Sequence, residues 1–320
     1  MNKLGQQAHP PLISNARLRF HLQMAPIYVA GCIFSIVGCQ VTSIRVPDLL
    51  DLVIVAVVLM LITMPLSLWY KEKGKIDLCD AALTIPWMIA FLLLLPFPVA
   101  VVARLSMHLG LRDALLTHVD QALSVSVPSI MAWASSHWLG LVANKCYPWF
   151  FVPFLVAYFL HAFLGRAKSA QHFIRVNIVA FFVGTALFAF FPAIGPWYGY
   201  HIAPTPLQAD CQAGIFIGRL PGPYVLHLFG VVCFPSFHVI WAILSAYSLC
   251  EFRLLRIPAI IVSGLIVFST LTTGWHYFAD VIGGALVATF AILVVKALSR
   301  FQSSYEMGQV GSESGNDSKV

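Results

Sequence analysis

Two short polar clusters interrupt the most hydrophobic third of this sequence, and they carry the residues best suited to chemistry. The first cluster runs from Phe234 to His238, and the second runs from Gly274 to Asp280. Ionisable side chains are costly at membrane depth, and where they occur they usually serve a function. Two histidines and one carboxylate can together supply a nucleophile, the partner that orients it and a general acid. Such a set can transfer a phosphoryl group without a metal ion.

The spacing within each cluster supports this chemistry. His276 and Asp280 are four residues apart, which places them on one face of a helix. A carboxylate in this position can accept a hydrogen bond from one imidazole nitrogen, so that the other nitrogen is free to attack. In the first cluster, Pro235 suits the first turn of a helix. The backbone N–H groups of that turn, together with the Ser236 hydroxyl, predict a binding site for a phosphate anion.

The composition places both clusters in a membrane protein. The chain has 320 residues, of which 59% are hydrophobic and only 10% are charged, whereas soluble domains carry about 25% charged residues. A helix needs about 20 apolar residues to cross a bilayer core. We therefore expect an all-α, polytopic transmembrane helical bundle of about eight spans, over residues 25–44, 49–70, 80–103, 148–164, 174–192, 236–252, 257–275 and 277–297.

The expected spans divide the chain into four parts. These are a cytoplasmic N-terminal lead over residues 1–24, an accessory transmembrane hairpin over 25–79, a six-span catalytic membrane domain over 80–299, and a disordered cytoplasmic tail over 300–320. The first 24 residues lack the pattern of a cleavable signal peptide.

Two long segments connect the spans on the side that carries the clusters. Residues 104–147 place Val119, Leu123, Val127 and Ile130 near helical spacing, with tryptophans around them. This pattern predicts an amphipathic helix in the outer membrane interface, and a loop packed on the bundle is the alternative. The second segment, residues 193–234, is rich in proline, glycine and aromatic residues, which indicates an ordered cap.

The distribution of charge predicts the orientation. The net charge of +6 raises the possibility of a nucleic-acid partner, but the basic residues are scattered over short loops, so we expect none. Fourteen of the nineteen lysines and arginines fall on the side that holds both expected termini. By the positive-inside rule this side is cytoplasmic. Both clusters then lie at the extracytoplasmic face, at the outer ends of their spans.

Other ionisable residues have simpler explanations. We expect no metal or other cofactor, because only Asp210 and Asp280 lie on the outer side of the last four spans, and hard cations require several oxygen ligands.

The seven cysteines show no CxxC pattern and mostly suit buried positions. Cys211 and Cys233 share an expected external loop and could form a disulfide. His161, near a cytoplasmic helix end, suits a packed or snorkelling side chain.

The two clusters resemble signature motifs of a known family. Pro235 to His238, followed by the pattern Ser269-x6-His276-x3-Asp280, is similar to the second and third motifs of the type-2 phosphatidic acid phosphatase superfamily. The resemblance implies that His238 protonates the leaving group, that His276 forms a phosphohistidine and that Asp280 supports it.

The chain departs from the phosphatases of this superfamily in its cations. Thr270 follows Ser269, where the phosphatases have an arginine that binds phosphate. Their first motif, Lys-x6-Arg-Pro, has only a superficial match in Lys168 and Arg175, which are expected about 30 Å away on the cytoplasmic side. Arg219 is the only lysine or arginine in the last large external loop. It could replace the missing cation, and a solvated loop charge is the alternative.

A further block of residues resembles one branch of the superfamily. The block from Phe191 to Tyr198, together with His276 to Asp280, is similar to the inositol phosphorylceramide synthase branch and, more distantly, to sphingomyelin synthases. These enzymes move a phospho-headgroup from a glycerophospholipid to a lipid alcohol. Together with the helix start at Ser236 and the loop cation Arg219, three residues of these blocks are expected to bind substrate: Trp197, Tyr198 and Tyr277.

We therefore expect an integral-membrane, metal-independent lipid phosphotransferase or phosphatase whose partners are a membrane lipid substrate and a lipid alcohol acceptor. Hydrolysis of a lipid phosphate or of polyprenyl pyrophosphate is the alternative within this class. A proton-coupled transporter and a catalytically inactive relative are alternatives from other classes. The sequence does not indicate an oligomeric state.

Overall fold

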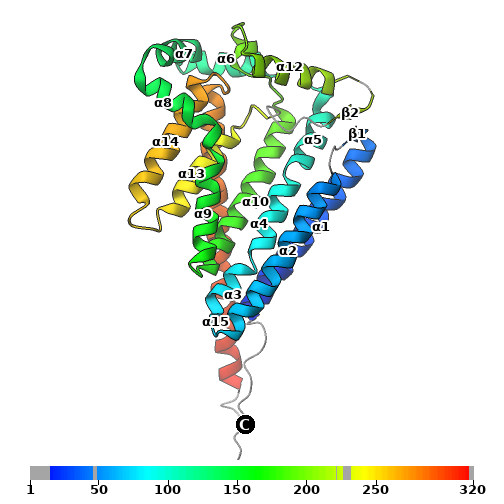
Figure 1. Ribbon diagram of the computed structural model, residues 1–320, viewed down its shortest axis with the longest axis vertical. Helices are drawn as coiled ribbons and strands as arrows, with labels where there is room; N and C mark the ends of the chain where they lie inside the picture. Colours follow the sequence, from blue (N-terminus) through cyan, green and yellow to red (C-terminus); the bar gives the residue numbers. More distant parts are fainter. Residues whose placement is uncertain (1–14, 46–48, 221, 226–231, 317–320) are drawn as a thin grey trace, which may run out of the picture.

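The computed structural model describes residues 15–45, 49–220, 222–225 and 232–316 (Figure 1). The first half contains α1 Asn15–Val41, β1 Ile44–Arg45, α2 Leu49–Glu72, α3 Ile76–Ala82, α4 Ile85–Leu94, α5 Pro96–Leu105, α6 Asp113–Ala122, α7 Val127–Ser136, α8 Trp138–Cys146 and α9 Phe151–Phe163. The second half contains α10 Ala167–Phe190, α11 Pro196–Gly199, α12 Pro206–Gly218, β2 Tyr224–Val225, α13 Phe237–Leu249, α14 Arg256–Thr272 and α15 Phe278–Asn316.

The expectation of an all-α membrane bundle is confirmed, since 79% of the structure is helical. Among the described residues, four helical stretches are long and apolar enough to cross a membrane, and a fifth qualifies if the bent pair of α8 and α9 counts as one span. The helices α13 and α14 are apolar but have only 13 and 17 residues. Length and composition thus support four or five of the eight expected spans. The two-residue strands β1 and β2 pair in parallel.

Three boundaries differ from those expected. The first helix begins at Asn15, ten residues early, because Phe20 and Met24 pack into the core. The division expected at residue 79 falls inside α3. The last helix continues to Asn316, so the expected tail is helical up to that residue, and no proline interrupts it. Residues 1–14 of the lead and 317–320 of the tail lie outside the described residues.

Short helices cover one end of the bundle. In Figure 1, α6, α7 and α12 lie across this end, with α8 leading down into the bundle. The single amphipathic helix expected within residues 104–147 is instead broken into α6, α7 and α8, because Ser124 adopts a positive φ of 59° and Pro128 starts a new helix. Of the residues at helical spacing, Val127 is buried and Leu123 is exposed. We call α6, α7, α8 and α12 the cap.

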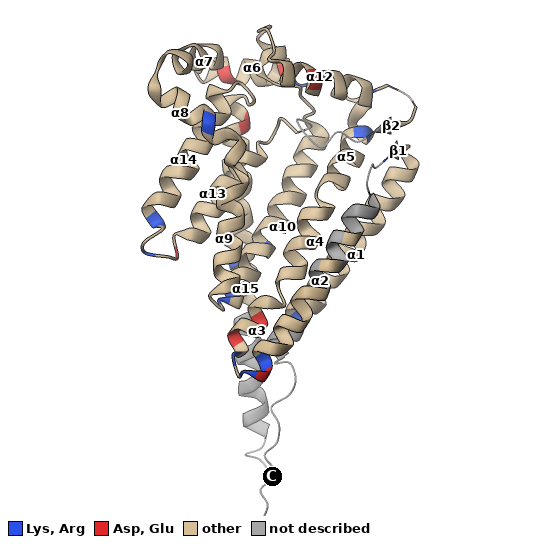
Figure 2. Cartoon of the chain, viewed as in Figure 1, with Lys and Arg blue, Asp and Glu red and all other residues tan. Residues whose placement is uncertain are grey.

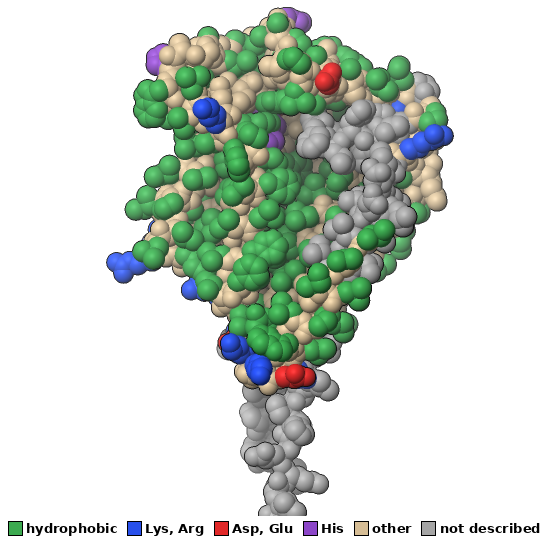
Figure 3. Space-filling view, viewed as in Figure 1, with side chains coloured by type: hydrophobic (Ala, Val, Ile, Leu, Met, Phe, Trp, Pro, Cys, Tyr) green, Lys and Arg blue, Asp and Glu red, His purple; other side chains and the backbone are tan. Residues whose placement is uncertain are grey.

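Charged residues gather at the two ends of the bundle (Figure 2), and apolar side chains cover the flank between them (Figure 3). At the end away from the cap, His161 is fully buried, and its Nε2 atom lies 3.0 Å from the Ser248 hydroxyl. It is therefore packed rather than snorkelling. Arg175, which was expected far from the two clusters, lies in the first half of α10 and donates to Gln23. The second half of α10 leads to the cap.

Candidate active site

The two polar clusters meet beneath the cap. The first lies at the start of α13, where the Ser236 hydroxyl accepts from the backbone N–H of Val239, 3.4 Å away, and caps the helix. The Ser236 backbone N–H donates to the Asp280 carbonyl over 3.2 Å, which ties α13 to the start of α15. The ring centres of His238 and His276 are 5.5 Å apart. Both histidines can thus face one phosphate.

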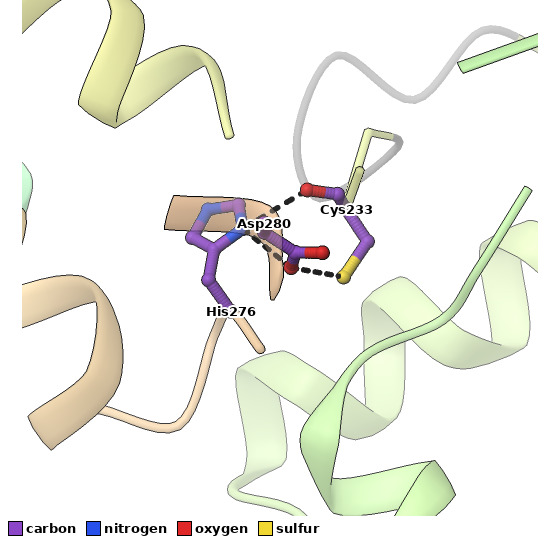
Figure 4. Close-up of side chains that lie close together, drawn as sticks. All are labelled: Cys233, His276 and Asp280. Atoms are coloured by element: carbon purple, nitrogen blue, oxygen red, sulfur yellow. Dashed lines mark hydrogen bonds and ion pairs between the residues drawn. The ribbon is translucent and has the colours of Figure 1, made fainter. Parts of the chain in front are cut away.

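His276 is held at one ring nitrogen (Figure 4). Its Nδ1 atom lies 3.2 Å from Asp280 Oδ2 and 3.0 Å from the carbonyl oxygen of Cys233. Both neighbours are hydrogen-bond acceptors, so Nδ1 must carry the proton, and the lone pair of a neutral ring then lies on Nε2. The exposed fraction is 3% for His276 and 0% for Asp280. The ring is thus fixed through Nδ1, and Nε2 is the nitrogen that does not take part in these two hydrogen bonds.

The Asp280 carboxylate is itself positioned by three donors. Besides the His276 ring, its Oδ2 atom accepts from the backbone N–H of Tyr277 at 2.9 Å and from the Cys233 thiol at 3.1 Å. Hydrogen bonds to the ionised form stabilise a buried carboxylate. Cys233 therefore serves both members of the pair, through its carbonyl and through its thiol. Nothing in the residues next to Cys233 marks it as part of the site.

Aromatic rings surround His238. The Tyr147 ring stacks on it with a centroid distance of 4.4 Å, and the Phe150 ring lies 4.0 Å away. Tyr147 also stacks on Trp275 at 6.0 Å. These rings confine the imidazole to one side of the site while it stays partly exposed.

Two carboxylates of α6 position the backbone around the histidine pair. Asp120 is fully buried and accepts from the backbone N–H groups of Phe278 and Ala279, at 3.0 and 2.8 Å. These groups belong to the first turn of α15, where a carboxylate is favoured by the helix dipole. Tyr200 donates to the same carboxylate at 3.2 Å. Asp120 thus caps the helix that carries Asp280.

Asp113 holds the backbone of the segment that follows α10. It accepts from the backbone N–H groups of Ile194 and Gly195, at about 3 Å, and from the Tyr277 hydroxyl at 2.9 Å. Burial raises the pKa of Asp113 and of Asp120, and these hydrogen bonds oppose the shift. The two aspartates are seven residues apart, a spacing of two helical turns that could have indicated a common face.

The five residues favoured for substrate binding fall into two groups. Ser236 and Tyr277 are buried against the segment of Asp280, and Trp197 packs its ring against Trp275 with 5.3 Å between centres. Tyr198 instead packs against Phe216, and the Arg219 guanidinium donates to the Leu109 carbonyl. The contacts of Tyr198 and Arg219 are thus with α12 and with the loop before α6, and not with the two histidines.

Cys211 and Cys233 do not form the disulfide considered above, because both are free and the Cys233 thiol is engaged by Asp280. The ligand atoms of Cys233, His276 and Asp280 lie within 4.8 Å of one another, a spacing that could also hold a metal ion. Metal binding would require the thiolate. Burial and the neighbouring Asp280 carboxylate raise the pKa of the Cys233 thiol well above its usual value. These three residues therefore fit a hydrogen-bonded group better than a metal site.

The comparison with protein families agrees with this geometry. A family model described as the PAP2 superfamily matches residues 114–294. This range exceeds half of the chain and contains both polar clusters, together with Asp120. No curated protein and no solved structure was found to match. The chain therefore belongs to the PAP2 superfamily.

Proposed function

We propose that the protein is an integral-membrane lipid phosphotransferase or phosphatase that acts through a phosphohistidine at His276. The observation that carries the proposal is the environment of the His276 ring. Its Nδ1 atom faces two acceptors, Asp280 and the Cys233 carbonyl, and its Nε2 atom is directed away from both. Membership of the PAP2 superfamily, together with apolar helices, supports a membrane enzyme of this general class.

The reaction would proceed in two steps. In the first, the Nε2 lone pair of His276 forms a bond to phosphorus while the bond from phosphorus to the leaving oxygen breaks. His238, when protonated, gives its proton to that oxygen. The phosphorylated imidazole carries a positive charge, which the Asp280 carboxylate stabilises. In the second step, a hydroxyl group attacks phosphorus, neutral His238 takes its proton, and the electrons of the broken P–N bond return to Nε2.

The identity of the attacking hydroxyl decides between transfer and hydrolysis. Attack by a lipid alcohol gives a new phospholipid, and attack by water gives a free phosphate or phospho-headgroup. We favour transfer of a phospho-headgroup from a phosphodiester, because this substrate brings one negative charge where a phosphomonoester brings up to two. In the described part of the chain, the contacts of His238 and His276 are with Asp280, Cys233 and aromatic rings rather than with lysine or arginine.

The backbone at the start of α13 supplies the remaining phosphate site in this proposal. The first-turn N–H groups of a helix attract anions, and α13 has 13 residues. The Ser236 hydroxyl already accepts from Val239, so it orients this turn. The distribution of lysine and arginine supports placing the site at the extracytoplasmic face, with both termini in the cytoplasm.

Incubation with labelled lipids tests the proposal. Purified protein is given phosphatidylinositol, phosphatidate or polyprenyl pyrophosphate, each with and without ceramide or diacylglycerol. Acceptor-dependent formation of a new phospholipid indicates transfer, and release of free phosphate indicates hydrolysis. Substrate uptake into vesicles without either product would instead favour a proton-coupled transporter.

A matched pair of variants links the activity to the site. His276→Gln removes the nucleophile and should abolish turnover of every lipid tested. His137→Gln changes an exposed histidine of the cap and should leave turnover unchanged. Full activity of the His276 variant would remove this residue as the nucleophile.

A further inference from the structure

A second feature of the molecule, an apolar cavity, lies on α10 away from the histidines. The cavity has a volume of about 380 Å³ and lies among α1, α4, α5 and α10. Its lining includes Tyr28, Gly31, Phe91, Phe181 and Thr185. This volume and this largely apolar lining are typical of sites that bind small apolar ligands. Among the residues that the structure describes, no charged side chain lines the cavity.

The cavity opens towards the flank of the bundle. Phe34 of α1 and Phe182 of α10 stand at its rim, with exposed fractions of 43% and 50%, whereas Phe91 and Phe181 are buried inside. Both α1 and α10 are long and apolar enough to cross a membrane. The opening therefore faces the hydrocarbon region of the bilayer, and its most accessible ligand is a lipid chain.

One polar group, the hydroxyl of Thr185, faces this otherwise largely apolar cavity. Its side chain lines the cavity and is 6% exposed, and its hydroxyl has no hydrogen-bond partner. A threonine within a helix commonly donates to the carbonyl four residues earlier, and a buried hydroxyl without a partner is destabilising. Water does not fill apolar cavities of this kind. An otherwise apolar ligand that carries an acceptor would supply the missing partner.

The position of Thr185 along the helix indicates which part of a lipid its hydroxyl would meet. It lies five residues before the end of α10 at Phe190, which is about 8 Å along the helix axis. Its hydroxyl is therefore near the capped end of the span, where the polar linkage of a lipid lies, rather than at mid-membrane. Tyr28, Phe91 and Phe181 line the space with apolar surface suited to the chain.

We propose that this cavity binds one hydrocarbon chain of a membrane lipid, with the Thr185 hydroxyl donating to the carbonyl of the ester or amide that joins the chain to the lipid. The site goes beyond the proposed function and is separate from His276. The neighbouring residue of α10, Gly184, lies against the other side, where an added Cβ would come within 2.9 Å of Phe237 at the start of α13. One helix thus separates the lipid cavity from the candidate active site.

A cavity-filling variant with a matched control tests the site. A Cβ atom built on Gly31 meets nothing within 4 Å, so Gly31→Phe places a ring into the cavity without a backbone clash. Gly264 is equally open but lies on an exposed face of α14, so Gly264→Phe is the control. Each protein is placed in phosphatidylcholine vesicles that contain a phosphatidylcholine with a photoreactive acyl chain, and the labelled residues are mapped by mass spectrometry.

The proposal predicts labelling of Phe91 and Phe181 in the wild-type protein and in Gly264→Phe, and its loss in Gly31→Phe. Undiminished labelling of these residues in Gly31→Phe would overturn it. So would wild-type labelling that occurs only on exposed helix faces. Because the readout is the position of the adduct, the result is independent of whether the protein turns over any lipid.

Substitution of Thr185 tests the hydrogen bond. Thr185→Val keeps the shape and removes the hydroxyl, so labelling of the cavity at limiting probe should fall about fivefold, the ratio that corresponds to one ordinary hydrogen bond. Thr185→Ser keeps the hydroxyl and should retain most of the labelling. Thr185→Val with full labelling and a raised melting temperature would show an unsatisfied hydroxyl without a lipid partner, which contradicts the proposal.

Discussion

The carboxylate of Asp120 provides a sharp test of how the cap supports the site. Asp120 comes from α6, far from the histidines in sequence, yet it accepts from the first two backbone N–H groups of α15. Those groups belong to Phe278 and Ala279, the two residues before Asp280. Replacement of Asp120 by alanine leaves both donors without an acceptor, the Ala279 group buried and the Phe278 group partly buried, and removes the partner of the Tyr200 hydroxyl.

The size of the effect follows from the number of donors. Each buried donor left without a partner costs about 1–3 kcal/mol, so the buried N–H group of Ala279 alone gives at least about 1 kcal/mol, and full burial of both groups would give about 6 kcal/mol for Asp120→Ala. Asp120→Asn keeps one oxygen that can serve one of the two donors, and the loss should be about half as large. A displacement of Asp280 and His276 by about 1 Å is enough to lower kcat about a hundredfold.

The assay combines thermal unfolding of the purified protein with lipid turnover. We expect stability and kcat to fall in the order wild type, Asp120→Asn, Asp120→Ala. The control is Asp210→Ala, which removes an exposed carboxylate of the cap and should change neither quantity. Wild-type stability and kcat in Asp120→Ala would refute the conclusion that α6 holds the start of α15.

Three further predictions concern the immediate surroundings of the histidines. Cys233→Ser keeps a donor to Asp280 and should retain most of the activity, whereas Cys233→Ala should lower kcat up to about fivefold. Removal of metal ions with a chelator should leave turnover unchanged, and activity restored specifically by zinc would instead assign Cys233, His276 and Asp280 to a metal site. Tyr147→Phe keeps the ring stacked on His238 and should preserve kcat, whereas Tyr147→Ala should lower it, and equal kcat values would show that the stacking has no role.

Sequence reasoning was most successful where the chemistry is local. His276 and Asp280 are four residues apart, and the helical repeat alone places them together. The start of a helix near Ser236 follows from the apolar run after it, although Pro235 precedes the helix instead of lying in its first turn, because Ser236 is the capping residue. The all-α membrane class follows from the shortage of charge. The first two features depend on neighbours within about one helical turn, and the third depends on composition alone.

The contacts that sequence reasoning missed join distant segments. Asp120 and Ala279 are separated by 159 positions, and Cys233 and His276 by 43. No local pattern marks Cys233, because half of its contribution comes from a backbone carbonyl that every residue possesses. Leu123 was expected in an apolar stripe, but a turn at Ser124 ends the helix there and leaves the side chain exposed.

The most direct test of the central proposal is to trap the phosphorylated enzyme. Purified protein is mixed with a lipid labelled at phosphorus, quenched in alkali and digested, and the labelled peptide is identified by mass spectrometry. The proposed mechanism predicts an acid-labile phosphohistidine at His276, formed in the wild type, formed more slowly in His238→Gln and missing in His276→Gln. Turnover of the labelled lipid with no label on His276 at any time before the steady state would contradict it.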